Sequence, residues 1–272
     1  MENVRLSDNI KINIVNETAN SGVFEIEGLY GGYGTTVGNA LRRVLLSSLP
    51  GAAITQVKIK GVGHEFTTIP GVIEDVVELS LNLKKIRFNF NVSYADYTGP
   101  EVLTLKAKGE GPVTAASIKG TNLVTVLNPD QHIATITDKG TELEIELTVA
   151  KGLGYVPVEA VKGEALPVGV IQIDAIFTPV TKVNFAVENM RVGDRTDYNK
   201  VRFMIETDGS ISPSAAMRKS ASILQDHYAK VYEQFKLLGG EAVAAPVAQE
   251  ESAEAEGEDT EKKSKAKKKS KK

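Results

Sequence analysis

The sequence predicts an α+β fold built mainly from antiparallel strands, with two helices and a charged C-terminal tail. Apolar and polar residues alternate with a period of two, most clearly over residues 143–149 and 86–92, as expected of half-buried strands. Two other segments have helical periodicity, and each is bounded by glycine or proline. Residues 241–272 have only alanine and valine as apolar residues, so we expect them to be disordered.

Shorter alternating runs predict further strands around residues 10–14, 57–59, 171–173 and 201–205. Clusters of proline, glycine, asparagine and aspartate separate the runs, as expected at turns. The clearest are residues 97–100, 128–130 and 138–140.

The composition excludes several classes of protein. The 272 residues are 42% hydrophobic and 25% charged, which is typical of globular domains. The absence of cysteine excludes a disulfide framework and a thiolate metal site. The first residues lack the layout of a signal peptide, and no apolar run approaches the ~18 residues of a membrane helix. We therefore expect a cytoplasmic protein without a membrane segment.

The charge distribution argues against nucleic-acid binding by the part of the chain before the charged tail, residues 1–249. Residues 250–272 hold seven acidic residues and eight lysines; without them, 24 basic and 28 acidic residues remain, a net charge of −4. A module that binds duplex DNA usually presents a basic face to the phosphates. The partners of residues 1–249 are therefore expected to be proteins.

The first predicted helix follows a glycine-rich turn and ends at Pro50-Gly51, with Thr35 or Thr36 as its N-cap. At 100° per residue, one apolar stripe suits packing on a sheet. Leu46 falls outside that stripe, beside Arg42 and Arg43, so it is either an isolated surface leucine or part of a contact patch. The stripe consists of Val37, Ala40, Leu41, Val44 and Leu45.

The second predicted helix has Ser212 as N-cap and Pro213 at its first position, and Gly239-Gly240 ends it. Its apolar residues alternate spacings of four and three, the heptad pattern of a helix that packs against another helix. Periodicity alone leaves open whether that partner helix lies in the same chain or in a second copy. The seam consists of Met217, Ala221, Leu224, Tyr228, Val231, Phe235 and Leu238.

No residue pattern predicts a catalytic or metal site. Asp194 and Asp197 are flanked by Arg191 and Arg195, which favours a salt-bridged loop over a metal site, and the three histidines are too dispersed to indicate zinc. The glycines before the first helix are compatible with a phosphate-binding loop, but no Gly-Lys-Ser/Thr follows, so a tight turn is favoured. A stand-alone homodimeric nucleotide-binding protein remains the alternative that this turn leaves open.

Seven segments together resemble bacterial RNA polymerase alpha subunits. They follow that family's order and cover nearly all of residues 1–240. They are residues 34–53 (GTTVGNALRRVLLSSLPGAA), 61–72 (GVGHEFTTIPGV), 74–76 (EDV), 81–84 (LNLK), 111–115 (GPVTA), 151–157 (KGLGYVP) and 189–197 (NMRVGDRTD).

The resemblance implies a dimerising α+β unit, residues 1–50 and 178–240, interrupted by a β-rich insertion, residues 51–177, and followed by the tail, residues 241–272. It implies a homodimer on which the beta and beta-prime subunits assemble, with no catalytic residue and no metal in this chain; magnesium is expected only in the catalytic subunit. An alpha-like scaffold that regulates polymerase is a further alternative. Dimer contacts are expected at Val37, Leu41, Val44, Leu45, Leu224, Tyr228, Val231 and Phe235.

The resemblance also carries contact residues for the large subunits onto this chain. Arg43 and Leu46, on the outer side of the first helix, correspond to the family's beta-docking positions, and an arginine fork beside an apolar anchor suits a protein interface. Further contact roles are implied for His64, Glu65, Gly71, Lys84, Ile173 and Arg195.

The tail is where the sequence departs from the family, whose linker leads to a helical domain that contacts promoter DNA. We expect that domain to be absent here, whether as a lineage trait or by truncation. The tail is either a solvated, solubility-conferring segment or a non-specific contact to a nucleic-acid backbone. The lysines implied in that contact include Lys262, Lys263, Lys267, Lys268 and Lys269.

Overall fold

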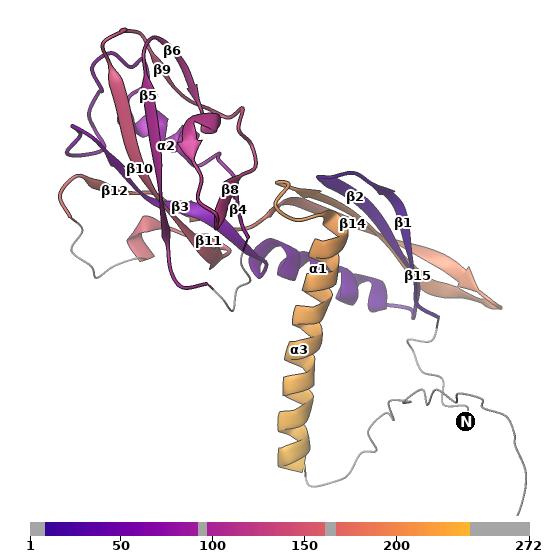
Figure 1. Cartoon of the computed structure of the whole chain (residues 1–272). Coiled ribbons are helices and arrows are strands. Elements are labelled where there is room, and N and C mark those ends of the chain that lie inside the picture. The colour runs from indigo at the N-terminus through magenta and orange to yellow at the C-terminus, as the bar shows by residue number, and fades with distance from the viewer. Residues whose placement is uncertain (1–8, 92–96, 161–166, 240–272) are drawn as a thin grey trace, which may run out of the picture. The chain divides into compact units, whose positions relative to one another are not determined.

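A computed structural model describes residues 9–91, 97–160 and 167–239 of the chain. Every strand pairing between its named strands is antiparallel, which confirms the predicted fold class. The first sheet has the strand order β1-β2-β15-β14 and joins segments from the two ends of the described sequence (Figure 1). Its strands are β1 (Lys11–Glu17), β2 (Ser21–Leu29), β14 (Val180–Val192) and β15 (Arg195–Thr207).

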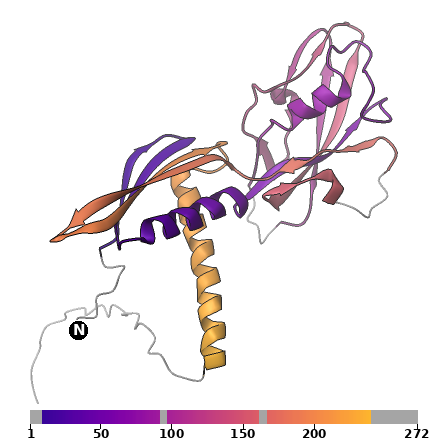
Figure 2. The same ribbon diagram turned by 180° about the vertical axis from the view of Figure 1, so that it is seen from behind.

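Helices α1 (Tyr33–Ser47) and α3 (Pro213–Gly239) contribute to the core beside this sheet. Figure 2 shows α1 running along the sheet. Buried residues of β2, α1, β14 and β15 form one hydrophobic cluster, against which the start of α3 also packs. The cluster includes Phe24, Leu41, Leu45, Val183, Phe203 and Ala216.

A second sheet, of order β12-β3-β10-β5-β7, carries its own hydrophobic cluster, built from residues 54–173. Helix α2 (Val76–Leu83) contributes Val76, Leu79 and Leu83 to that cluster. The strands are β3 (Pro50–Ile59), β5 (Glu101–Lys108), β7 (Ile118–Lys119), β10 (Glu142–Leu153) and β12 (Val170–Gln172).

Three two-stranded ladders and two short 3-10 helices complete the described chain. The ladders pair β4 (Phe88–Phe90) with β8 (Val124–Val126), β6 (Gly111–Thr114) with β9 (His132–Ile136), and β11 (Tyr155–Val156) with β13 (Ala175–Ile176). The 3-10 helices are η1 (Ala115–Ser117) and η2 (Val158–Ala160). The predicted domain boundaries, near residues 50 and 178, fall between the two large hydrophobic clusters. That the two parts are independent domains stays a prediction.

Helix α1 begins three or four residues earlier than the predicted threonine caps, Thr35 or Thr36, indicated. Its N-cap is Gly32, whose φ of 87° suits a residue without a Cβ, and neither Thr35 nor Thr36 caps it. The side chain of Asn199, from β15, takes that role instead: its Oδ1 accepts the amide hydrogens of Gly32 at 2.9 Å and Gly34 at 3.2 Å. The predicted cap was wrong because the true acceptor is distant in sequence.

The buried face of α1 also differs from the predicted stripe. Gly34, Gly38, Leu41 and Leu45 are its buried residues, whereas Val37, Ala40 and Val44 are half-buried at its flanks. The glycines bring the helix close to the sheet: a Cβ on Gly38 would lie 2.6 Å from Cε2 of Phe185. A hydrophobicity pattern does not count glycine as apolar, so the helix is turned from the orientation that the pattern indicated.

Helix α3 has the bounds predicted for it. Ser212 Oγ accepts the amide hydrogen of Ala215 at 3.4 Å, and Pro213 opens the helix. Residues 213–224 include buried and half-buried positions, but residues 225–238 are all exposed in the single chain. Within the described residues, no helix is both long enough and apolar enough to cross a membrane.

Candidate protein-binding surfaces

Three of the predicted contact residues meet at one groove beside the second sheet. Glu65, from the loop after β3, Lys84, at the end of α2, and Ile173, after β12, line a groove of about 580 Å³. The neighbouring His64 is exposed on the same loop. Residues that are up to 108 positions apart in sequence therefore converge on one surface.

An ion pair organises one wall of this groove. Lys84 Nζ lies 3.1 Å from Asp174 Oδ2, and both side chains are partly accessible. Asp174 Oδ1 also accepts the amide hydrogen of Val158 at 3.0 Å. These two interactions, the Val158 hydrogen bond first, hold the pKa of Asp174 below its usual value. Lys84 is consequently neutralised by its own chain rather than free to bind an anion.

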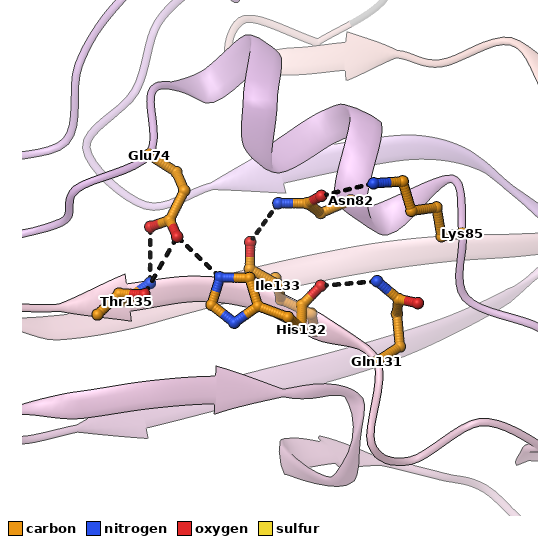
Figure 3. A network of polar contacts seen from close by, with 7 residues as sticks. All are labelled: Glu74, Asn82, Lys85, Gln131, His132, Ile133 and Thr135. Carbon is orange, nitrogen blue, oxygen red and sulfur yellow. Dashed lines mark hydrogen bonds and ion pairs between the residues drawn. The ribbon is translucent and has the colours of Figure 1, made fainter.

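The loop of residues 65–75 is anchored to β9 by the buried carboxylate of Glu74 (Figure 3). Glu74 Oε1 lies 2.8 Å from Nε2 of His132, and Glu74 Oε2 accepts the amide hydrogen of Thr135 at 2.6 Å. The Thr135 hydroxyl donates to Oε1 at 3.1 Å. Asn82, from α2, adds a hydrogen bond from its amide nitrogen to the Ile133 carbonyl at 3.2 Å.

Burial by itself raises the pKa of Glu74, but the hydrogen bonds from His132 and Thr135 outweigh it and hold that pKa below its usual value. Gly71 completes the anchor: its φ is +80°, its carbonyl accepts the amide hydrogen of Thr137 at 2.9 Å, and a Cβ there would lie 2.1 Å from Thr141 Oγ1. The position of Gly71 in this sequence thus has a structural reason independent of any partner.

Arg43 and Leu46 lie on α1, apart from the groove residues in sequence and core. Arg43 is exposed, as the helical projection predicted. Leu46 is half-buried and packs against the first core, so it is not an isolated surface leucine. Its backbone carbonyl also accepts a hydrogen bond from Thr178 Oγ1 at 3.1 Å. Arg43 is therefore the more available of the two.

Arg195 is held in place by its own chain at the start of β15. It forms two hydrogen bonds with Asp197, at 3.0 and 2.7 Å, and its guanidinium lies 4.7 Å from the ring centroid of Tyr30. The arginine hydrogen bonds lower the pKa of Asp197. Arg191 and Asp194 form a looser pair at 3.9 Å. The predicted ion pairs are confirmed, but Arg191 lies in β14 and Arg195 and Asp197 lie in β15, so they flank a hairpin turn rather than form a loop.

The predicted dimer residues divide into a buried and an exposed group. Leu45 is completely buried and Leu41 nearly so, which makes them core residues of their own chain rather than free contact residues. Val37, Val44 and Leu224 are half-buried. The exposed group lies on α3, where Tyr228 is 63% and Phe235 68% accessible; Val231, Tyr232, Leu237 and Leu238 are exposed as well.

A hollow of about 480 Å³ with an apolar lining lies between the first sheet and α3. Ile12 and Ile14, from β1, form one side, and Met217 and Ala221 form the other. Leu41 contributes to the floor. Both isoleucines are exposed large hydrophobic residues, so no residue in the described part of the chain covers this surface.

Sequence reasoning missed an exposed apolar group beside the groove. Phe66 is 78% accessible, and Ile73, Val77 and Leu81 are exposed at intervals of four residues. Because α2 also buries Val76, Leu79 and Leu83, it is apolar on two faces. The spacing of four between Ile73, Val77 and Leu81 was the signal in the sequence that could have found this group.

Comparisons with known proteins agree with this architecture. Residues 57–178 match the family model described as the RNA polymerase Rpb3/RpoA insert domain. The chain is 50% identical over 219 residues to the DNA-directed RNA polymerase subunit alpha of Alkaliphilus oremlandii, covering 80% of this chain and 67% of that protein. The subunit alpha of Limosilactobacillus reuteri is 50% identical over 220 residues, with coverages of 80% and 68%. That of Roseiflexus sp. is 48% identical over 232 residues, with coverages of 85% and 69%.

The fold is thus an antiparallel α+β chain whose second sheet matches a polymerase insert domain. At about half identity over two thirds of its relatives' length, the chain belongs to the alpha subunit family of DNA-directed RNA polymerase, a nucleotidyltransferase complex. The lysines of the tail, Lys262 to Lys269 among them, lie outside the described residues.

Proposed function

We propose that this chain is a homodimerising scaffold, on which the beta and beta-prime subunits of a DNA-directed RNA polymerase assemble in the cytoplasm for DNA-templated transcription. The two-part organisation, residues 1–50 with 178–240 around residues 51–177, belongs to the same proposal. Nucleotidyl transfer takes place in the catalytic subunit, which also holds the magnesium. This chain contributes to it by building the complex.

The observation that carries the proposal is the uncovered heptad seam of α3. Tyr228, Val231, Phe235 and Leu238 keep the four-and-three spacing, yet all are exposed in the single chain. Burying each of them contributes about 1.5–3 kcal/mol, which the helix gains only when a partner covers the seam. A second copy offers a suitable surface, the apolar hollow around Ile12, Ile14 and Met217.

A two-fold axis would make this pairing reciprocal, because the same seam and hollow are present in each copy. Val37 and Val44, on the flanks of α1, would extend the contact, and the half-buried Leu224 would join it to the seam. Leu41 and Leu45 support the helix from the core. The dimer thus uses the predicted residues in two roles, contact and support.

The large subunits would dock on three further surfaces of each chain. One is the outer side of α1, with Arg43 and the edge of Leu46. The second is the groove lined by Glu65, Lys84 and Ile173, with His64 beside it and Gly71 shaping the anchored loop. The third docking surface contains Arg195, which Tyr30 and Asp197 hold in place.

The stand-alone nucleotide-binding alternative is disfavoured by the glycine-rich turn itself. A phosphate would need the free amides at the start of α1. The amides of Gly32 and Gly34 already donate to Asn199, and that of Tyr33 donates to the Tyr30 carbonyl at 2.9 Å. Asp194 and Asp197 are likewise occupied by arginines.

The test is assembly with beta and beta-prime, using the wild type, Arg43→Ala and the control Lys108→Ala, another exposed cation. We expect the wild type to form an actively transcribing complex, and Arg43→Ala to remain dimeric in sedimentation but to capture beta at least about tenfold more weakly. Normal beta capture by Arg43→Ala removes this residue from the docking site. Wild-type dimer that binds neither large subunit contradicts the scaffold role, and bound subunits without transcription favour the regulatory alternative. A nucleotide titration of the isolated dimer tests the remaining alternative, a stand-alone nucleotide-binding protein.

A further inference from the structure

The groove at Glu65, Lys84 and Ile173 is one part of a longer surface along α2. A second hollow, of about 530 Å³, is lined by Phe66 and Asp75 and shares Glu65 and Val77 with the first. Because two lining residues are common, the hollows adjoin. The surface is called the α2 groove here, and its defining residues are Glu65, Phe66, Val77, Leu81, Tyr155 and Ile173.

The α2 groove contains apolar side chains among polar ones such as Ser80 and Gln172. Val77 and Leu81 are exposed on α2, and Ile173, after β12, also lines the groove. Each hollow also has one aromatic residue in its lining, Phe66 in the second and Tyr155, which is 57% accessible, in the first. Aromatic anchors around an aliphatic centre are the composition of a protein interface.

The charges around the α2 groove are one-sided. Among the described residues that line it, four carboxylates, those of Glu65, Asp75, Glu159 and Asp174, stand against one cation, Lys84. Asp174 neutralises that cation at 3.1 Å, and Asp75 Oδ1 accepts the amide hydrogen of Glu78 at 2.7 Å.

The remaining two carboxylates, Glu65 and Glu159, are exposed and form no ion pair with any described residue of the chain. A partner that covers the apolar side chains of the groove also lies against these two carboxylates. Leaving them desolvated without a counter-charge is costly.

We infer that the α2 groove receives a protein segment in which apolar side chains are flanked by lysine or arginine. The apolar residues cover Val77 and Leu81, and the cations meet Glu65 and Glu159. An acidic segment and a nucleic-acid backbone are both repelled by the same carboxylates. The inference rests on the proposed function, since it gives the chemistry of the large-subunit segment that docks here.

The charge at the rim of the groove, which is defined by Glu65 and Glu159, can be reversed while the apolar side chains of the groove stay unchanged. The rim variant is Glu65→Lys with Glu159→Lys; the matched control is Glu110→Lys with Glu142→Lys, which changes the net charge equally at two exposed acids outside the groove. Association with beta and beta-prime is measured for both dimers at about 50 mM and about 500 mM salt, where screening is weak and strong.

We expect the rim variant to associate with one large subunit about tenfold more slowly than the control at low salt, and the difference to shrink at high salt. Equal rates for the two variants under both conditions overturn the inference.

A second measurement separates the inference from the proposed function. Two labelled peptides with the same leucines, one with lysines and one with glutamates, are titrated into the wild type and the rim variant. We expect the wild type to prefer the lysine peptide about tenfold and the rim variant to reverse that preference. Absence of binding or of preference overturns the inference, even when the large subunits assemble. A wild type that prefers the lysine peptide but captures no large subunit overturns the proposed function alone.

Discussion

The Oδ1 atom of Asn199 lies 3.2 Å from the backbone nitrogen of Gly34, so a strand side chain caps the first turn of α1 across 165 residues of sequence. Asn199 is buried, and its Nδ2 atom donates to Asn189 Oδ1 at 3.1 Å. The cap joins the beginning of α1 to the β14–β15 hairpin. Because a glycine cannot supply a side-chain acceptor, Gly32 depends on this distant residue.

Replacing Asn199 with Ala should lower the free energy of unfolding by about 1–2 kcal/mol, because two amides lose their acceptor. The measurement is urea unfolding, with a lower midpoint and an unchanged slope. Asn199→Asp keeps an acceptor and should recover part of the loss. Asn184→Ala, at an exposed position of β14, is the control; an equal effect of the two alanine variants would contradict the cap.

Gly38→Ala should destabilise the fold by about 1–2 kcal/mol, although alanine is the better helix former. The new methyl group would lie 2.6 Å from the ring of Phe185, which packs on Phe203 at 5.8 Å between centroids. Thermal unfolding measures the change. Adding Phe185→Leu should recover stability; a double variant no more stable than Gly38→Ala would show that the ring is not the obstacle.

Glu74 should make the stability depend on pH in the acid range. Its pKa is lower in the folded chain than in the unfolded chain, so its contribution is present above pH ~4.5 and is lost as pH falls through the folded pKa. Glu74→Gln should cost about 1–3 kcal/mol at pH ~7.

Urea unfolding between pH ~7 and pH ~3 checks the sign of this effect. The wild type should lose more stability than Glu74→Gln over that interval, while Glu110→Gln should follow the wild type. Parallel curves for the wild type and Glu74→Gln would exclude this carboxylate as the source.

The carboxyl group of Glu144 should titrate at about 2, because hydrogen bonds from Lys106 and Lys60 stabilise its charged form. An NMR pH titration measures the value directly. Lys106→Ala and Lys60→Ala should each raise it, the first by more, since Lys106 is the larger cause. An unshifted Glu144 in Lys106→Ala would contradict the assignment.

Tyr228→Ser combined with Phe235→Ser should weaken dimerisation by at least about four orders of magnitude, since the dimer loses about 1.5–3 kcal/mol of burial for each of four side chains. Sedimentation velocity measures the dimer, and circular dichroism monitors the helix. Glu233→Ser, an exposed position of the same helix, should remain dimeric. A double variant that sediments as the wild type would place the dimer contact elsewhere.

Much of the fold was predictable from local pattern. Alternating residues in β10 and β15 and the proline and glycine that bound α3 report directly on backbone geometry, since a period of two or a cap is a local property. The ion pair of Arg195 with Asp197 was predictable for the same reason, because its partners are two residues apart.

The sites were predictable only as isolated residues. Arg43 was correctly expected on the surface, but Leu45 is a core residue and Phe66 was overlooked. One groove brings together Glu65, Lys84 and Ile173. Their convergence depends on how α2, β12 and the loop after β3 pack on one another. The residue pattern within each segment does not encode that packing.

By itself, the sequence determined the α+β class, several strands, the helices α1 and α3 but not α2, the heptad seam of α3 and the membership of the polymerase alpha family. Tertiary structure alone decided that Asn199 caps α1, that Gly38 lets Phe185 approach, and that the seam beyond Leu224 is uncovered. The physical reason is one of range: periodicity and capping depend on neighbours along the chain, whereas close approach and burial depend on segments brought together by packing.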